Sequence, residues 1–248
     1  MPEQYYSLDS DKAASRGEPS AVWRTGQARR LEMIREYGAE SFKGRVLING
    51  TGVGAYQSRL AADTQFIVGL DIEFSRLMEA KTENEHLICA AGEELPFAER
   101  SFSGVLSNEV LEHVADDRRA VCEVNRVLSS GGRFLIFCPN RGYPFETHGV
   151  YRKGEYRFGN KLFVNYLPRK WRDELAPHVR VYTRENLDAL VRGLPLRKEK
   201  VTTIFGAYDN IIQKKPVFGK LLRGVLHLLE KTPLNRLGLS HFWVLRKH

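Results

Sequence analysis

Short apolar runs alternate with amphipathic stretches along the first 140 residues of the chain. The runs predict five buried β-strands, at residues 46–48, 66–70, 87–89, 103–107 and 133–138. The stretches beside them predict helices at residues 28–37, 56–62, 74–82 and 118–128. The glycines of the stretch 129–132 are expected to end the last of these helices. Alternating strands and helices are typical of an α/β fold, a doubly wound parallel sheet with helices on both faces.

The second part of the chain has a different pattern. A helix is predicted at residues 183–191, with Thr183 as its N-cap, followed by strands at 197–205 and 240–245. Residues 151–178, rich in Tyr, Arg, Lys and Phe, interrupt the alternation as an insertion that could form a lid. Residues 214–231 predict a basic amphipathic helix, which either packs on the sheet or lies on a membrane surface.

Three glycines follow the first predicted strand at alternate positions: Gly50, Gly52 and Gly54. Glycine lets the backbone turn sharply and approach a ligand, and the helix that begins here points its amide groups at the same place. Asp71 ends the second strand, where its carboxylate can accept both hydroxyls of a ribose. This is the first half of a nucleotide-binding sheet. Gly50-x-Gly52-x-x-Ala55, with an acid about 20 residues on, also leaves an NAD-type oxidoreductase open.

Length and charge indicate one domain with two unlike halves. The 248 residues suit a single domain, with a loose arm at 1–20, a cofactor-binding half at 21–140 and an acceptor-side half at 141–248. Residues 1–140 hold 16 Lys and Arg against 21 Asp and Glu, for a net charge of −5. Residues 141–248 hold 22 against 9, for a net charge of +13. A basic half fits an anionic partner such as a membrane surface, or is only a solvated face.

The lack of a long apolar run and the cysteine pattern favour a cytoplasmic protein. The basic half suggests a peripheral membrane location as the alternative. No run of about 18 apolar residues exists, so no transmembrane helix is expected. None of the three cysteines forms a CxxC motif, and all three are expected to be reduced packing residues. A nucleic-acid partner is not expected, since the fourth strand ends in Asn108-Glu-Val-Leu rather than an Asn-Pro-Pro-Tyr-type motif.

Six ordered motifs lie between residues 45 and 140. The motifs are Val46-Leu-Ile-Asn-Gly-Thr-Gly-Val-Gly54, Val68-Gly-Leu-Asp-Ile72, Glu93-Glu-Leu-Pro-Phe97, Ser101-Phe102, Ser107-Asn-Glu-Val-Leu-Glu-His-Val114 and Glu123-Val-Asn-Arg-Val-Leu-x-x-Gly-Gly-Arg-x-Leu-Ile136. In this order and spacing they resemble the motifs of class I S-adenosylmethionine-dependent methyltransferases. The resemblance implies a Rossmann-like sheet of seven strands with the last one antiparallel. It also implies S-adenosylmethionine as the cofactor.

The resemblance assigns cofactor roles to particular residues. Asn49, Gly50, Gly52 and Gly54 would carry the methionine part, with Asn108 closing that side, while Asp71 would take the ribose hydroxyls. Ile72, Ala91 and Gly92 would lie around the adenine. Two positions depart from the family pattern, because Ile48 and Ala91 stand where the family usually has acids. A methyltransferase fold that binds or scaffolds without turnover is therefore a second hypothesis.

Two segments offer catalytic side chains. The loop after the fifth strand carries Glu146 and His148, and His148 is the proposed base or acceptor contact. His113 lies in the Glu109-Val-Leu-Glu112-His113 run, which resembles that of ubiquinone-type O-methyltransferases linked to a divalent metal. Glu109, Glu112 and His113 are thus the candidate Mg²⁺ ligands, although the same run also has a purely structural interpretation.

The function predicted from the sequence is methyl transfer from S-adenosylmethionine to an oxygen atom. The acceptor is expected to be a small molecule or a group linked to a lipid or a glycan. Positioning and desolvation carry most of such a reaction, and a base is needed only if the acceptor is a hydroxyl.

Overall fold

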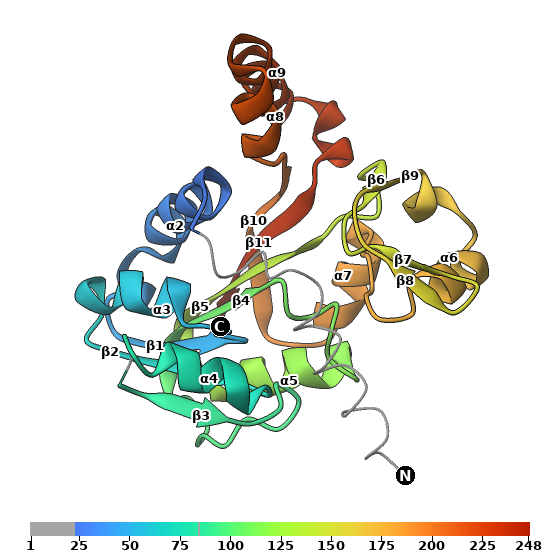
Figure 1. Ribbon diagram of the computed structural model, residues 1–248. Helices are drawn as coiled ribbons and strands as arrows, with labels where there is room; N and C mark the ends of the chain where they lie inside the picture. The colour runs from blue at the N-terminus through green and yellow to red at the C-terminus, as the bar shows by residue number, and fades with distance from the viewer. Residues whose placement is uncertain (1–22, 84) are drawn as a thin grey trace.

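The computed structural model describes residues 23–83 and 85–248. The arm expected at residues 1–20 lies outside the described residues. Within them, seven strands form one sheet in the order β10-β11-β5-β4-β1-β2-β3 (Figure 1). The strands of this sheet are β1 Arg45–Asn49, β2 Phe66–Asp71, β3 Leu87–Cys89, β4 Phe102–Asn108, β5 Leu128–Pro139, β10 Leu196–Ile204 and β11 Ser240–Lys247. β11 runs antiparallel to both β10 and β5, which confirms the predicted seven-stranded sheet with an antiparallel last strand.

Helices cover both faces of the sheet, because alternate strand residues point to opposite sides. Leu47, Val105 and Phe134 belong to an apolar layer that includes residues of α5 and α7. Val46, Ile48 and Phe137 belong to a second layer, with residues of α2 and α3. The main helices are α2 Thr25–Gly38, α3 Ala55–Leu60, α4 Phe74–Ala80, α5 Asp117–Val127 and α7 Arg184–Val191, with short 3₁₀ turns η1 Ala39–Phe42 and η2 Ala61–Asp63.

The start of β5 differs from the prediction. The helix before it ends at Val127, and the strand begins at Leu128 rather than at Arg133. The pairing of β4 with β5 shifts register between Phe102 and Gly104, and Gly131 has a φ of +79°. The glycines at 129–132, which were expected to end the helix, therefore lie within β5 and form an irregularity there. Gly131, which has no Cβ, can adopt the left-handed conformation that this irregularity requires.

Residues 145–175 form the insertion between β5 and α7. It contains β6 Phe145–Glu146, β7 Val150–Arg152, β8 Glu155–Arg157, β9 Lys161–Leu162, η3 Val164–Tyr166 and α6 Arg169–Leu175. β6 pairs with β9, and β7 pairs with β8. The chain then enters α7 through the predicted N-cap, where the Thr183 hydroxyl accepts a hydrogen bond from the amide of Asn186. The insertion follows β5 directly, so it lies beside the carboxyl end of that strand.

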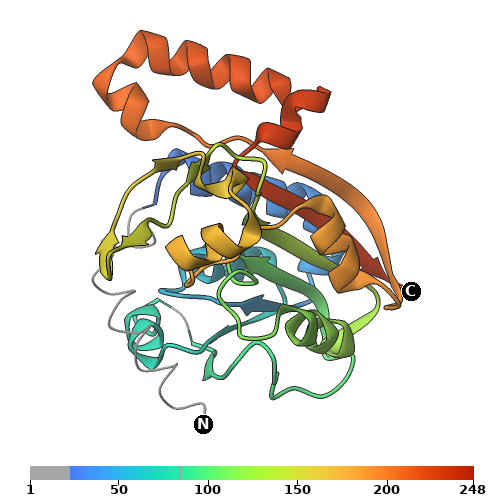
Figure 2. The same ribbon diagram turned by 90° about the vertical axis from the view of Figure 1, so that its right-hand side faces the viewer.

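The helix predicted at residues 214–231 is confirmed as α9 Pro216–Leu229, which follows a short helix α8 Asp209–Lys214 and precedes the turn η4 Pro233–Leu237. Proline has no N–H and disfavours a helical conformation in the residue before it, which explains why α9 begins at Pro216 rather than at Lys214. Of the two interpretations of this helix, packing on the sheet is wrong. α9 projects beyond the body of the molecule (Figures 1 and 2), and its only buried residue is Gly219.

Candidate active site

The loop after β1 has the backbone conformation that glycine allows. Gly50, Gly52 and Gly54 have φ values of +75°, +56° and +77°, in the left-handed region where other side chains are strained. Gly50 also has no room for a side chain, because a Cβ there would lie 2.2 Å from Cγ2 of Val110. The glycine loop thus lies against the segment that follows β4, so the ends of β1 and β4 form one site.

Asp71 lies at the carboxyl end of β2 and faces the glycine loop. One oxygen accepts a hydrogen bond from the Gly52 amide at 2.7 Å, and the other accepts from the Glu73 amide at 3.0 Å. A carboxylate oxygen can accept more than one hydrogen bond, so both retain capacity for a ligand hydroxyl. Ile72, the next residue, exposes an apolar surface beside this carboxylate.

Asn49 and Gly92 bring the ends of β1 and β3 together. The Asn49 side chain is buried, and neither of its amide atoms has a hydrogen-bond partner among the described residues. A Cβ on Gly92 would lie 3.1 Å from the Asn49 Oδ1 atom, so the two residues are in contact. A buried amide without a partner fits a site where a polar ligand completes the hydrogen bonds. Ala91, next to Gly92, brings no carboxylate, and Ile48 is buried in the apolar layer on the α2 side.

Arg30 is a site residue that the sequence analysis missed. Its guanidinium donates to Asn108 Oδ1 at 2.7 Å, contacts Glu109 Oε1 at 2.8 Å and lies 5.0 Å from the ring centre of Phe137. One feature of the sequence could have identified Arg30. It lies four residues before Ile34, so it places a charge on the apolar face of helix α2. Arg30 therefore joins α2 to the end of β4.

Glu109, which is partly exposed, and Glu112, which is buried, form a pair with unlike protonation. Desolvation opposes the charge of Glu109, but the Arg30 guanidinium, His148 and a hydrogen bond with Glu112 together outweigh it and lower the Glu109 pKa to about 2. Burial and the Glu109 carboxylate together raise the pKa of Glu112 well above its ordinary value. Glu109 also accepts a hydrogen bond from the Ser240 hydroxyl at 3.0 Å, and its φ is +57°. A non-glycine residue held in this conformation is a feature of functional sites.

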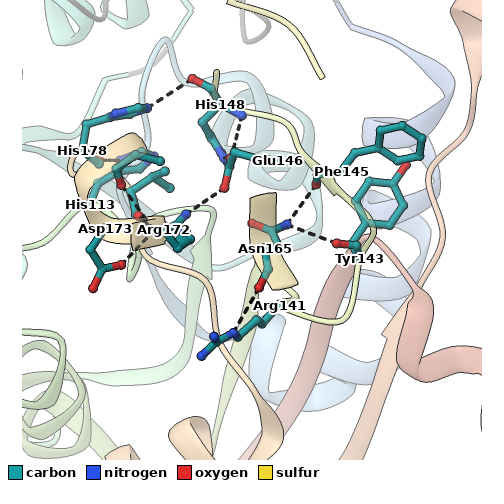
Figure 3. A network of polar contacts seen from close by, with 12 residues as sticks. His113, Arg141, Tyr143, Phe145, Glu146, His148, Asn165, Arg172, Asp173 and His178 are labelled. Atoms are coloured by element: carbon teal, nitrogen blue, oxygen red, sulfur yellow. Dashed lines mark hydrogen bonds and ion pairs between the residues drawn. The ribbon is translucent and has the colours of Figure 1, made fainter. Parts of the chain in front are cut away.

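His148 is held by a buried carboxylate in the loop after β5 (Figure 3). The Glu146 carboxylate lies 3.0 Å from His148 Nδ1 and accepts from the His148 amide at 2.9 Å. Its other oxygen accepts from Arg172, on α6, at 2.7 Å. Burial works against the Glu146 charge, but His148 and Arg172 outweigh it and lower the Glu146 pKa to about 2. Glu146 is therefore an ionised anchor for the His148 imidazole.

His113 completes the polar cluster. The His113 and His148 rings meet edge to face, with 5.8 Å between their centres, and His113 Nδ1 lies 3.3 Å from the carbonyl oxygen of His178. His113 is exposed at the surface, but desolvation by the groups around its ring, with a contribution from His148, lowers its pKa to about 4, so this imidazole is neutral at pH 7.

The possible metal ligands differ from the predicted set. Ligand atoms of Glu112, His113 and His148 lie within 4.8 Å of one another, and this is the group that the described residues bring together. Glu109 is outside it, because Arg30 and Ser240 hold its carboxylate. In the predicted set of Glu109, Glu112 and His113, His148 therefore takes the place of Glu109.

Comparison with known proteins agrees with this geometry. A family model described as a methyltransferase domain matches residues 47–136. The probable S-adenosylmethionine-dependent methyltransferase of Mycolicibacterium smegmatis is 34% identical over 117 residues, which are 46% of this chain and 45% of that protein. The O-methyltransferase resE of Aspergillus sclerotiorum is 30% identical over 187 residues, which are 65% of this chain and 70% of that protein.

Solved structures share the fold. An S-adenosylmethionine-dependent methyltransferase from Mesorhizobium loti aligns with a TM-score of 0.62 at 20% identity, covering 90% of this chain and 98% of that one. The chain spans less than half the length of the first curated relatives that it matches, at 44%, 45% and 47%. The segment that matches the family model contains the glycine loop, Asp71 and Asn108, so the family match covers the candidate cofactor site. The chain therefore belongs to the class I S-adenosylmethionine-dependent methyltransferase family.

Proposed function

We propose that the protein transfers the methyl group of S-adenosylmethionine to a hydroxyl oxygen of a small molecule, or of an acceptor linked to a lipid or glycan. The cofactor, when bound, supplies an electrophilic methyl group. The observation that carries the choice of oxygen is the chain from Arg172 through Glu146 to His148, beside the end of β4. A hydroxyl acceptor must lose a proton, and an imidazole fixed by a carboxylate is suited to take it.

The carboxyl ends of the central strands would hold the cofactor. The glycine loop would pass around its methionine part, and Asp71 would accept hydrogen bonds from the ribose hydroxyls. Asn49 would supply its amide to a polar group of the ligand, while Ile72, Ala91 and Gly92 would lie against the adenine. The unpartnered amide of Asn49 and the remaining acceptor capacity of Asp71 support this assignment.

His148 would act as the base. An Nδ1–H donated to Glu146 leaves Nε2 as the acceptor of the substrate proton, which selects the tautomer. Glu146 remains ionised, as its pKa of about 2 indicates, and stabilises the imidazolium that forms. Glu146 thus positions His148 and does not itself take the proton. The neutral His113 ring offers a second contact for the acceptor hydroxyl.

The first experiment is calorimetric titration of the protein with S-adenosylmethionine and with its demethylated product. Micromolar binding is expected, because the glycine loop and Asp71 are intact. The alternative of a fold that has lost turnover predicts binding without transfer, and it is motivated by Ile48 and Ala91. Transfer of a labelled methyl group from the cofactor to a panel of hydroxylated acceptors and lipid extracts distinguishes an active methyltransferase from a protein that only binds the cofactor. A complete lack of binding at millimolar cofactor would contradict the proposed function.

The role of His148 is tested by His148→Ala. Loss of a general base typically lowers turnover by about 10²–10⁴-fold. The affinity for S-adenosylmethionine should stay unchanged, since His148 does not hold the cofactor in this proposal. His248→Ala, at an exposed position, is the matched control. If both variants turn over at the wild-type rate, His148 is not the base.

A metal-assisted mechanism is the second candidate, favoured by the grouping of Glu112, His113 and His148. Two imidazoles and a carboxylate suit a transition metal better than magnesium, which prefers oxygen ligands. The protein would then lose activity on treatment with a chelator and regain it with added Zn²⁺ or Mn²⁺. Activity that survives the chelator supports the base mechanism.

We also propose that the protein works in the cytoplasm. Cys89, Cys122 and Cys138 are all unpaired, which suits a reducing compartment. Cys89 is exposed, and so it is not the packing residue that the sequence suggested.

A further inference from the structure

The segment from α8 to η4 connects the last two strands at the functional edge of the sheet. Ile204 of β10 pairs with Ser240 of β11, and Ser240 pairs with Pro139 at the carboxyl end of β5. β10 therefore ends on the same edge as β1, β2 and β4, where the candidate active site lies. Figures 1 and 2 both show α8 and α9 projecting outward from this edge. We call residues 209–237 the helical projection.

Polar contacts fix the base of the helical projection to the domain. Glu230 receives two hydrogen bonds from Arg29 and one from the Phe205 amide, at 2.8 Å for the amide. His227 Nε2 lies 3.1 Å from the Gly206 carbonyl oxygen. The Asn140 side chain donates to the carbonyl oxygens of Arg236 and Gly238 at 2.8 and 2.6 Å. Together with the Thr25 amide, which donates to Asp209 at the start of the segment, these contacts hold the orientation of α9 relative to the active-site edge.

The outer face of α9 is an exposed apolar stripe. Val217, Leu221, Val225 and Leu228 recur at intervals of three and four residues, which places them on one side of the helix. Val217 is 85% exposed, Leu221 67% and Leu228 66%, and Phe218 beside them is also exposed. Leu234 and Leu237 on η4 add further exposed apolar surface. A contiguous surface of this kind indicates an interaction site rather than scattered exposure.

Cations surround the stripe. The helical projection contains Lys214, Lys215, Lys220, Arg223, Lys231 and Arg236, against only Asp209 and Glu230. Both acids have partners, since Glu230 pairs with Arg29 and Asp209 accepts from the Thr25 amide. The outward charge is therefore strongly positive. Two copies of α9 facing each other would bring like charges together, whereas an anionic surface is complementary.

We propose that the helical projection docks the protein on the surface of an anionic lipid bilayer. The apolar stripe enters the boundary between headgroups and acyl chains, and the lysines contact the lipid phosphates. The proposed attachment is at the surface of the bilayer. Among the described residues, no helix is long and apolar enough to cross a membrane. Docking brings the active-site edge to the bilayer. If the proposed methyl transfer holds, the acceptor is then a hydroxylated molecule carried in the lipid.

Co-sedimentation of the full chain with vesicles tests the docking. Vesicles of phosphatidylcholine with phosphatidylglycerol should bind the protein in low salt, while pure phosphatidylcholine vesicles and 1 M salt should release most of it. The double variant Phe218→Glu/Leu221→Glu should lose at least tenfold in partition. Phe74→Glu/Met78→Glu is the matched control, because it places the same two charges at exposed apolar positions on α4. Lys220→Glu/Lys231→Glu should weaken binding to the anionic vesicles, with Lys43→Glu/Lys81→Glu, at two exposed positions away from the helical projection, as its control.

Three results would overturn the docking. The first is no sedimentation with anionic vesicles in low salt. The second is equal loss in Phe218→Glu/Leu221→Glu and Phe74→Glu/Met78→Glu. The third is a wild-type dimer by light scattering that the double variant converts to a monomer without any vesicle binding, which would assign the stripe to a second copy of the chain. Calorimetry with S-adenosylmethionine in the absence of vesicles reports separately on the proposed function.

Discussion

At the residue scale, the proposed base depends on one buried ion pair. Arg172 and Glu146 are 3% and 1% exposed, and Arg172 also donates to the carbonyl oxygens of Ala176 and Val179. Removing one member of such a pair leaves an uncompensated buried charge, which costs about 3–5 kcal/mol. Arg172→Met should lower the free energy of unfolding by about that amount, as measured by urea denaturation.

The double variant Glu146→Gln/Arg172→Met is the matched control for this ion pair. It removes both charges, so it should be more stable than Arg172→Met alone. Both variants should keep the seven-stranded sheet intact, since the ion pair lies in the insertion and not in the sheet. Equal destabilisation in the single and double variants would mean that Arg172 acts only through its contacts with the backbone carbonyls.

A second residue-scale prediction concerns acid stability. His241 is buried on β11, its Nε2 lies 2.9 Å from the Tyr182 carbonyl oxygen, and burial lowers its pKa to about 4. The unfolded chain, with a histidine pKa near 6.5, binds more protons between pH 6.5 and 4, so stability falls as the pH falls through this range. Between pH 7 and pH 5 this amounts to about 2 kcal/mol.

His241→Gln should remove this part of the pH dependence. Urea denaturation at pH 7 and pH 5 should show the wild type losing about 2 kcal/mol more than the variant over the interval. The other titrating groups are common to both proteins and cancel in the comparison. A variant with the wild-type slope would show that His241 is not responsible.

At the element scale, two glycines on α9 have opposite expected effects. Gly219 lies against α8, and a Cβ there would approach the Ile212 Cα atom to 2.7 Å. Gly224 has no atom within 4 Å of its Cβ position. Gly224→Ala should stabilise α9 by about 0.5–1 kcal/mol, the usual gain of alanine over glycine within a helix. Gly219→Ala should instead force α8 and α9 apart.

Hydrogen exchange of the α8 and α9 amides measures this difference. Protection should rise in Gly224→Ala and fall in Gly219→Ala, while the amides of β5 remain as in the wild type. The same direction of change in both variants would contradict the packing of α8 on α9.

The helices and strands that the sequence predicted well are those set by local patterns. The strands around Leu47 and Val68 and the loop at Gly50 follow from apolar runs and glycine spacing. What the sequence analysis missed is contact over long separations, such as Arg30 with Asn108 and Arg172 with Glu146. No periodicity in the chain indicates which distant cation reaches a given carboxylate. Pro216 was a visible local signal, and it explains why α9 begins two residues after the start that the sequence analysis predicted.

At the scale of the whole molecule, the proposed cofactor site draws on the ends of β1, β2, β3 and β4. A ligand that binds there selects the folded sheet, and stabilisation at 100 times the dissociation constant is about 2.7 kcal/mol. For a chain of this size each kcal/mol raises Tm by about 2–4 °C. Saturating S-adenosylmethionine should therefore raise Tm by about 5–10 °C.

Substitution separates binding from chemistry in the same thermal assay. Asp71→Asn loses hydrogen bonds to a charged group, worth about 1.5–3 kcal/mol, so its Tm shift at the same cofactor concentration should be about half of the wild-type shift or less. Asp63→Asn, at an exposed position paired with Arg35, should keep the full shift. His148→Ala should also keep it, because the base contributes to transfer and not to cofactor binding. A full shift in Asp71→Asn, or none in His148→Ala, would mean that the cofactor lies elsewhere on the sheet edge.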